Sequence, residues 1–205
     1  MIEIAAVYGS PRRKGNTSTL LEQAVAGAND AGAHVTEIVL RDLKMSPCLE
    51  IYGCKKSGSC VIKDDFQTVE SLLQRIDGLM LASPIFFYSV SAHTKILMDR
   101  CNSLWVKKYW VEKKPFGQKH YPRKGLFMSV GSTRGKRLFD GAVLSVKYFM
   151  DALDMQLWKT LLYREIETEG QIREHSSALQ EAYDAGHALV QALADGSGAF
   201  QGRSA

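Results

Sequence analysis

Short apolar runs alternate along this chain with segments in which apolar residues recur at helical spacing. The apolar runs lie at 2–8, 34–40, 78–83, 125–132 and 155–166, and a helical pattern follows each of them. A Cys/Gly/Pro loop is expected over 45–62, and one helix is expected through Lys95 to about Leu104. Strands that alternate with helices form a parallel sheet, because each helix returns the chain to the edge where the next strand begins. Mostly apolar strands suit a sheet that is covered on both faces. The alternation predicts an α/β fold, a three-layer sandwich with a five-stranded parallel sheet and helices on both faces.

The length and composition indicate one soluble globular domain. The chain has 205 residues, of which 45% are hydrophobic and 23% are charged, as is ordinary for a single domain. We expect this domain to cover residues 1–195, followed by a flexible tail over 196–205. No apolar run reaches the roughly 18 residues of a membrane span, and the first residues lack the basic start of a signal peptide. We therefore expect a cytoplasmic protein with no membrane partner.

The predicted sheet indicates where a ligand should bind. In sheets of this kind, ligands lie beyond the carboxyl ends of the strands, at the point where the winding reverses. The relevant loops follow the first, third and fourth predicted strands. They read GSPRRKGNTS (9–18), SPIFFYS (83–89) and GSTRG (131–135).

The first loop has the composition of an anion site. It leads into a predicted helix N-terminus, where unpaired N–H groups and the helix dipole attract negative charge. It is not a nucleoside-triphosphate loop, because Lys14 precedes Gly15, and it lacks the middle glycine of a dinucleotide fingerprint. Its donors suit a phosphate monoester; they are Ser10, Arg12, Asn16, Thr17 and Ser18. The alternative is that Asn16 or Thr17 only caps the helix while the arginines face solvent.

The second and third loops suit a flat ring attached to that phosphate. SPIFFYS places three aromatic side chains after Pro84, at a strand end where a purely structural aromatic residue would more often be buried. In the third loop, Gly131 and Gly135 permit a close backbone approach, and Ser132 and Arg134 can donate hydrogen bonds. Together, the three loops predict a site for a phosphorylated planar molecule.

The order of these segments resembles the NADPH-dependent FMN reductase family, and in particular its iron–sulfur flavoprotein branch. The resemblance covers roughly residues 2–165 and is carried by the opening segment through Cys48, by DDFQTVESLLQRIDGLMLASPIFFYSVSAHTKILMDR and by SVGSTRG. It implies a flavodoxin-like fold with non-covalently bound FMN. The residues that it implies for the FMN phosphate are Ser10, Arg12, Asn16, Thr17 and Ser18. Those that it implies for the isoalloxazine are Pro84, Ile85, Phe86 and Phe87 on one side, and Gly131, Ser132 and Arg134 on the other.

The resemblance implies an FMN-dependent oxidoreductase that passes electrons from NAD(P)H through FMN to a flavin, quinone or similar small acceptor. Because the flavin ring carries the redox chemistry, we predict no catalytic side chain. A hydrolase is disfavoured, since Thr133 stands where the Gly-x-Ser-x-Gly motif needs serine, and the five histidines lack zinc-ligand spacing. The alternative from another class is an electron-transfer protein supplied by ferredoxin.

A basic stretch at 107–124 bears on the partners of the protein. It holds seven Lys or Arg residues against Glu112 alone. We interpret it as a solvated connection beside the cofactor site; the alternative is a nucleic-acid surface, and we predict no nucleic-acid partner. Aromatic residues in or beside the stretch predict a homodimer or homotetramer, with packing on their own domain as the alternative. They are Trp105, Trp110, Phe116 and Tyr121.

The segment PCLEIYGCKKSGSC departs from the motif of the iron–sulfur branch, which is Cys-x2-Cys-x2-Cys followed by a fourth cysteine. Cys48, Cys54 and Cys60 match the first, third and fourth positions, whereas Ile51 occupies the second and Cys101 is distant along the chain. Because a cubane cluster takes four thiolates, we predict FMN without a cluster and no bound metal. The alternatives are a three-cysteine cluster with an open iron site, or reduced thiols that include an oxidisable pair.

Overall fold

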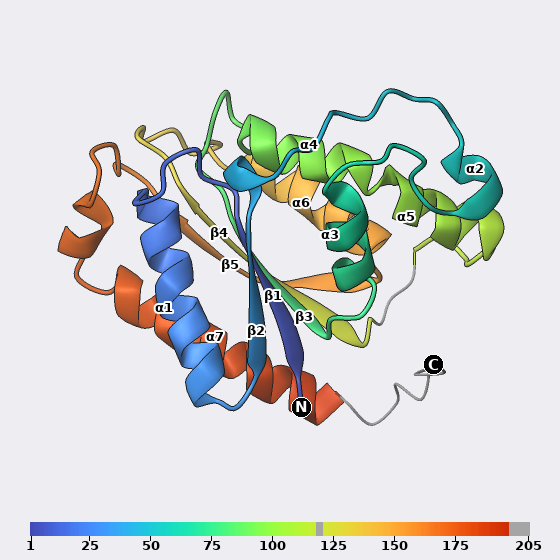
Figure 1. Ribbon diagram of the computed structural model, residues 1–205. Helices are drawn as coiled ribbons and strands as arrows, with labels where there is room; N and C mark the ends of the chain where they lie inside the picture. Colours follow the sequence, from blue (N-terminus) through green and yellow to red (C-terminus); the bar gives the residue numbers. More distant parts are fainter. Residues whose placement is uncertain (118–120, 197–205) are drawn as a thin grey trace.

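The computed structural model describes residues 1–117 and 121–196, and a parallel sheet runs through its centre (Figure 1). The sheet has five strands in the order β2-β1-β3-β4-β5. They are β1 (Glu3–Tyr8), β2 (His34–Val39), β3 (Gly78–Ala82), β4 (Arg123–Val130) and β5 (Met155–Tyr163). The winding reverses between β1 and β3, the arrangement in which ligands bind at the carboxyl edge. The predicted fold class is confirmed.

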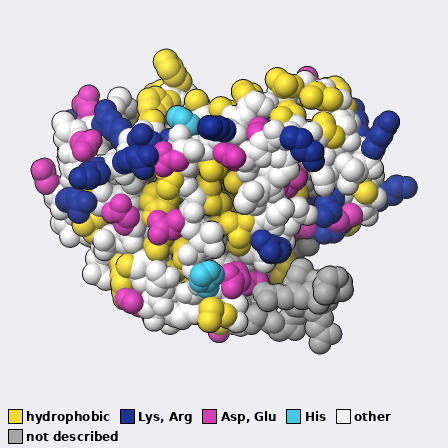
Figure 2. Space-filling model, in the orientation of Figure 1, with side chains coloured by type: hydrophobic (Ala, Val, Ile, Leu, Met, Phe, Trp, Pro, Cys, Tyr) yellow, Lys and Arg dark blue, Asp and Glu magenta, His cyan; other side chains and the backbone are white. Residues whose placement is uncertain are grey.

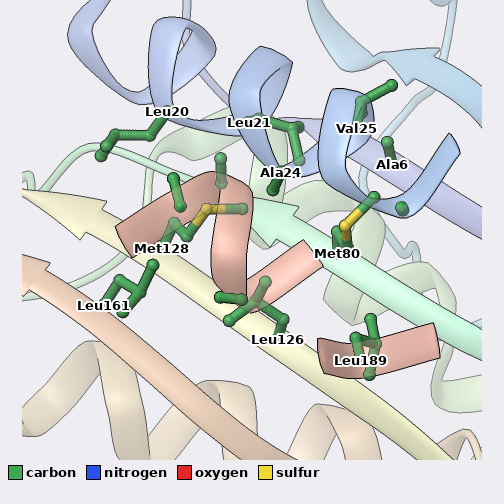
Figure 3. Close-up of a cluster of buried hydrophobic side chains, with 14 of the residues drawn as sticks. Ala6, Leu20, Leu21, Ala24, Val25, Met80, Leu126, Met128, Leu161 and Leu189 are labelled. Atoms are coloured by element: carbon green, nitrogen blue, oxygen red, sulfur yellow. The ribbon is translucent and has the colours of Figure 1, made fainter. Parts of the chain in front are cut away.

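One face of the sheet is covered by α1 (Asn16–Asp30) and α7 (Ala178–Gly196) (Figure 1). Leu20, Leu21 and Ala24 of α1 lie over Met80 of β3 and Met128 of β4, as Figure 3 shows. All of these side chains are fully buried. The helical spacing recognised in the sequence thus corresponds to the face of α1 that packs on the sheet.

The opposite face is covered by α3 (Phe66–Leu73), α4 (Ala92–Arg100), α5 (Asn102–Val106) and α6 (Asp140–Ala152). Neighbouring residues of one strand point to opposite faces. Ala5 and Val7 therefore join this second core, while Ala6 belongs to the first. A strand with a helical layer on each side needs apolar residues at consecutive positions, which explains the unbroken apolar runs.

Short helical turns complete the chain: η1 (Leu40–Asp42), α2 (Cys54–Ser57), the π-helical η2 (Lys107–Val111) and η3 (Gln171–Glu174). Two sequence interpretations need correction here. The predicted loop at 45–62 contains α2, and the predicted helix through Leu104 breaks at Cys101 into α4 and α5. Neither feature disturbs the apolar spacing, so the sequence pattern alone could not indicate it.

The basic stretch is only in part the predicted solvated connection: residues 110–117 are exposed, but Lys108 is not. Lys108 is 2% exposed, and its ammonium lies 3.2 Å from an Asp151 carboxylate oxygen and 3.0 Å from an Asp154 oxygen. Lys114 also pairs with Asp154, at 2.7 Å. These acids lie at or just after the C-terminal end of α6, whereas the 131–135 loop leads to its other end. The basic charge is thus neutralised in part by packing within the chain.

The predicted tail lies almost wholly outside the described residues. Gly196, its first residue, is the last residue of α7, and 197–205 are not described. No helix within residues 1–117 and 121–196 has the length and apolar character needed to cross a bilayer. The single domain over 1–195 stays a prediction.

Candidate functional site

The three loops singled out in the sequence meet at the carboxyl edge of the sheet. The Gly9 N–H donates to the Ala82 carbonyl at 2.7 Å, which joins the loop after β1 to the end of β3. The Ile85 N–H donates to the Val130 carbonyl at 3.0 Å, and the Gly131 N–H donates to the Tyr163 carbonyl at 3.0 Å. Each loop therefore begins as a continuation of the sheet before it turns away from it.

A network of buried hydroxyl groups fixes these loops to one another. The Ser91 hydroxyl donates to the Gly9 carbonyl at 2.5 Å, and the Ser83 hydroxyl accepts the Ser91 N–H at 2.9 Å. Ser129 of β4 donates to the Ser83 carbonyl at 2.7 Å. These three serines are at most 1% exposed. This network was not predicted from the sequence, because its only local signal is that Ser91 caps α4 by accepting the Thr94 N–H.

Gly9 makes the close approach of the first loop feasible. A Cβ atom at this position would lie 2.1 Å from the Thr94 hydroxyl oxygen and 2.8 Å from the Ala82 carbonyl oxygen. Any larger residue would push the loop away from β3 and α4. The glycine therefore sets the distance between the start of the anion loop and the loop after β3.

The N-terminus of α1 remains available to an anion. Gly15 is its N-cap residue and supplies no side-chain cap, so the first N–H groups of the helix stay unpaired by a cap. The alternative in which Asn16 or Thr17 is the N-cap is therefore wrong. The Asn16 amide instead ties α1 to the segment after β5, donating to the Thr168 carbonyl at 2.8 Å and accepting the Ile172 N–H at 3.2 Å.

The cations of this loop differ in their partners. Arg13 pairs with Asp42 at 2.8 Å, whereas the exposed Arg12 makes no side-chain hydrogen bond or ion pair within residues 1–117 and 121–196. Arg12 lines a cavity of about 180 Å³ together with Ser10 and Ser18. Thr17 is 1% exposed and lies just inside the helix. Arg12 is the charged member of the predicted phosphate ligands, and its guanidinium is available to bind an anion.

The same cavity has an acidic wall. Glu37 contributes to its lining, as does Tyr8. Burial raises the pKa of Tyr8, and the neighbouring Glu37 raises it further. Tyr8 therefore remains a neutral phenol at physiological pH. An anion is expected to bind on the Arg12 and helix side of this cavity.

The second loop displays aromatic side chains on a strained tight turn. Phe86 and Ser89 exchange backbone hydrogen bonds, each 2.9 Å long, around Phe87 and Tyr88. Both central residues have positive φ, 49° and 61°, a conformation that bulky side chains rarely adopt. Phe87 is 99% exposed, and Figure 2 shows hydrophobic side chains over this uppermost loop. Such strain is typical of binding sites.

The third loop closes the site on the β5 side. The Arg134 guanidinium lies 2.6 Å from a Glu165 carboxylate oxygen, and both side chains are exposed. Ser132 is also exposed, and Gly131 leaves room for the Leu138 side chain, which a Cβ would approach to 2.7 Å. The Tyr88 hydroxyl reaches toward Gly135. This contribution of Tyr88 was not predicted, although the residue lies within the SPIFFYS loop.

A second concentration of functional groups lies away from these loops, in the cysteine segment, residues 45–65. The Arg100 guanidinium at the end of α4 pairs with both Asp64 carboxylate oxygens, at 2.6 and 3.0 Å, and donates to the Ser46 carbonyl at 2.9 Å. Burial would raise the pKa of Asp64, but hydrogen bonds from Arg100 and from the Ser46 and Phe66 N–H groups lower it to about 2. The pair holds both ends of the segment against α4.

Comparison with known proteins finds relatives that are named iron–sulfur flavoproteins. An iron–sulfur flavoprotein of Methanocaldococcus jannaschii is 36% identical over 103 residues, which are 50% of this chain and 53% of that protein. The chain spans about half the length of the curated relatives that it matches.

Solved structures show the fold. A flavone reductase superimposes with a TM-score of 0.70 at 17% identity, covering 97% of this chain and 65% of that one. An NAD(P)H:quinone oxidoreductase from Methanothermobacter marburgensis gives 0.68 at 16% identity, covering 92% and 96%. The flavodoxin-like architecture is thereby confirmed.

The model of one protein family covers most of the chain. It describes NADPH-dependent FMN reductases and matches residues 2–159, which confirms the resemblance found in the sequence and FMN as the cofactor of this family. The chain therefore belongs to the NADPH-dependent FMN reductase family.

Proposed function

We propose that this protein is an FMN-dependent oxidoreductase that takes electrons from NAD(P)H and passes them to a flavin, quinone or similar small acceptor. The observation that carries the proposal is the meeting of an uncapped helix N-terminus and an exposed aromatic turn at one edge of the sheet. FMN has a phosphate monoester at one end and a flat ring at the other, so it requires both features. When bound, FMN supplies the ring that accepts a hydride and releases electrons.

The proposed phosphate site lies at the start of α1. The N–H groups of the first helical turn would point at the phosphate oxygens, and Arg12 would add a charge-assisted bond. Ser10, Thr17 and Ser18 remain proposed hydroxyl donors. The Asn16 side chain is committed to Thr168 and Ile172, so its proposed contribution is the backbone N–H together with the position of the helix end.

The proposed ring site lies between the second and third loops. Pro84, Ile85, Phe86 and Phe87 would line one side, and Gly131, Ser132 and Arg134 the other. Two contacts support this arrangement: Ile85 lies against Gly131, and Tyr88 reaches Gly135. These side chains would orient the ring, and because the flavin itself would accept the hydride, the proposal assigns no catalytic side chain.

Anaerobic stopped-flow mixing tests the proposal. The purified yellow protein should lose its flavin absorbance within a single turnover on mixing with NADPH or NADH, and regain it on adding a quinone or free flavin. The faster nicotinamide identifies the co-substrate, and the faster acceptor indicates the acceptor class. Bound FMN that neither nicotinamide reduces would contradict the proposal.

The second candidate function is that of an electron-transfer protein reduced by ferredoxin. It is favoured by one observation, that the curated relatives reported above include an iron–sulfur flavoprotein. Reduction of the bound FMN by chemically reduced ferredoxin, but not by NAD(P)H, would establish this second candidate and exclude the first. Either reaction is proposed to take place in the cytoplasm, where both electron donors are regenerated.

We also propose self-association as a homodimer or homotetramer. Trp105 packs against Trp110, Tyr109 and Phe116, with ring centroids between 5.3 and 6.3 Å apart, so part of this aromatic set is packed within the chain. Trp110 and Phe116 nevertheless stay 49% and 72% exposed, and aromatic residues are enriched at interface cores. A light-scattering mass near 22.8 kDa at micromolar concentration would contradict this proposal.

A further inference from the structure

A second cavity, of about 550 Å³, lies between the cysteine segment and the C-terminal ends of α4 and α6. Met98 and Asp99 of α4 and Phe149 and Ala152 of α6 contribute to its lining. The loops of the proposed flavin site lead into the opposite ends of these two helices. The cavity is therefore separate from the carboxyl edge, and its volume is within the range of small-molecule sites.

Aromatic rings form much of the wall of this cavity. They belong to Tyr52 of the cysteine segment, Trp105 of α5, and Tyr148 and Phe149 of α6. Phe149 is buried, whereas Tyr52 and Tyr148 are 49% and 65% exposed. Two of the four rings thus keep a large surface that a ligand in the cavity could cover.

The charge of the cavity is negative. Its lining, taken over the described residues, contains the carboxylates of Glu50 and Asp99 but no lysine, arginine or histidine. Phe149 and Ala152 lie in the last turn of α6, and the end of a helix adds partial negative charge. The chain as a whole has a formal net charge of +4, so the cavity departs from the average charge of the protein. Its lining favours a cation over an anion.

The sulfur atoms in the lining do not change this balance. Burial raises the pKa of Cys54 and of Cys101, so both stay neutral thiols at physiological pH and offer polarizable surface. Over residues 1–117 and 121–196, no three His, Cys, Asp or Glu side chains are grouped so that they could hold a metal ion. An organic cation suits the aromatic wall better than a metal ion does.

The chain already holds an ammonium group against one of these rings. The Nζ of Lys55, a residue outside the lining, lies 3.9 Å from the centre of the Tyr52 ring and 4.8 Å from that of Trp110. A cation within about 6 Å of a ring centre is attracted by the negative charge of the aromatic face. Tyr52 therefore shows, with a side chain of its own chain, the kind of contact that a bound cation would make.

The placement of the two carboxylates indicates which kind of cation fits. Asp99 already pairs with Lys95 at 2.6 Å, and both side chains are about half exposed. Glu50 is exposed as well. A primary amine among the rings would thus have no buried carboxylate to accept its N–H groups, and unpaired buried donors are costly. A quaternary ammonium group has no N–H to satisfy, and its positive charge still interacts with the rings.

We infer that this cavity binds a small organic cation with a quaternary ammonium group, held by cation–π contacts with Tyr52, Trp105 and Tyr148. The carboxylates of Glu50 and Asp99 attract the charge from the rim of the cavity. The binding is non-covalent. The inference goes beyond the proposed function and does not rest on it, because the cavity lies outside the loops of the flavin site.

Isothermal titration calorimetry with two matched probes tests the inference. The FMN-loaded protein is titrated with choline and with its uncharged isostere, in which a tert-butyl group replaces the trimethylammonium group. Because the two probes have the same shape, a difference in Kd reports the charge alone. Choline should bind roughly 5- to 30-fold more tightly than the isostere. Equal affinities, or no binding of choline in the millimolar range, would overturn the inference.

Variants of Tyr148 place the binding in this cavity. Tyr148→Leu removes one ring at an exposed position of α6, so the fold should tolerate it and the Kd for choline should rise roughly 3- to 10-fold. Tyr148→Phe keeps the ring and should bind choline as the wild type does. An unchanged FMN content shows that both variants are folded. Tyr148→Leu protein with the wild-type affinity for choline would overturn the assignment of the cavity.

A charge variant separates the rim from the rings. Glu50→Gln should weaken the binding of choline several-fold and leave the binding of the isostere unchanged. Asp184→Asn, at an exposed position of α7, makes the same change of net charge outside the cavity and should affect neither probe. A similar loss of choline affinity in both charge variants would overturn the role of the cavity carboxylates.

Discussion

The loops at the carboxyl edge and the cysteine segment are both irregular, yet different interactions hold them in place. Neutral hydroxyls of Ser83, Ser91 and Ser129 fix the loops at the edge. A buried ion pair between Arg100 and Asp64 fixes the cysteine segment. Neutral hydrogen bonds keep their strength across the ordinary pH range, whereas an ion pair depends on the ionisation of its carboxylate. The two regions should therefore respond differently to mutation and to acid.

They also differ in what they leave unpaired. The carboxyl edge presents the exposed Arg12 and the N-terminus of α1, both suited to an anion. Beside the cysteine segment lie the buried Nε–H of Arg100 in α4 and a cavity lined by cysteine side chains. A cofactor phosphate suits the first arrangement. The comparison teaches that the unpaired donors at the carboxyl edge are accessible to solvent, whereas the unpaired Arg100 Nε–H is buried.

The largest effect is expected from breaking the buried pair. Arg100→Met leaves Asp64 with little exposure and no counter-charge, and removing one partner of such a pair costs about 3–5 kcal/mol. The free energy of unfolding, measured by denaturant titration of the FMN-loaded protein, should fall by that amount. The double variant Arg100→Met with Asp64→Leu leaves no unpaired buried charge, so its free energy of unfolding should fall less than that of the single variant. Equal losses in the single and double variants would contradict a stabilising role of the pair.

The next effect concerns the accessible anion site. Arg12→Ala removes a charge-assisted bond worth about 1.5–3 kcal/mol, so the Kd for FMN should rise roughly 10- to 150-fold. Arg13→Ala is the matched control, because Arg13 already pairs with Asp42 at the surface and should change the Kd only slightly. Fluorescence titration of the apoprotein with FMN measures both. Equal effects of the two variants would remove Arg12 from the phosphate site.

Acid should act on the cysteine segment before it acts on the hydroxyl network. The pKa of Asp64 is lowered from 3.8 to about 2 in the folded protein. A depressed carboxyl pKa stabilises the fold above the unfolded value, and this contribution, about 2 kcal/mol, is lost as the pH falls from roughly 4 toward 2.

Unfolding free energies measured across this range test the acid effect. Asp64→Asn should be less stable than the wild type at neutral pH but should lose stability less steeply as the pH falls. An unchanged slope in Asp64→Asn would assign the acid sensitivity to another carboxylate.

The smallest effect is expected at the hydroxyl network. Ser91→Ala removes the N-cap of α4 and the bond to the Gly9 carbonyl, which should lower the free energy of unfolding by about 1–2 kcal/mol without changing its pH dependence. Ser145→Ala, at a half-buried position of α6 where the hydroxyl donates within its own helix to the Gly141 carbonyl, is the control and should stay within about 0.5 kcal/mol of the wild type. A pH-dependent loss in Ser91→Ala would undo the contrast between the two regions.

The local pattern predicted the scaffold well because burial on both faces of a sheet demands apolar runs with helical patterns between them. The ends of the elements were less accurate. The last predicted strand was extended to Ile166, but it ends at Tyr163, before Glu165 adopts a positive φ of 59°. The single helix predicted through Leu104 breaks at Cys101. Such breaks depend on contacts with other segments, which spacing does not record.

For the candidate site, too, the general location was predicted well and the individual contacts were not. The three loops were identified from strand order alone, since parallel strands bring their carboxyl ends to one edge. The individual roles were harder to predict: the Asn16 amide is used by Thr168 and Ile172, more than 150 residues away in each case. Tyr88 and the serine network were not predicted, because the sequence does not indicate which distant group a hydroxyl will bond.

By itself, the sequence determined the layered sheet, the three ligand loops and the departure at Ile51, because hydrophobic period, loop order and residue identity are local properties. Only the tertiary structure decided that Arg12 is free while Arg13 is paired, and that Cys101 shares a cavity with Cys48 and Cys54. These facts depend on which distant segments come into contact. That contact is set by the packing of helices on the sheet, so separation along the chain says nothing about distance in space.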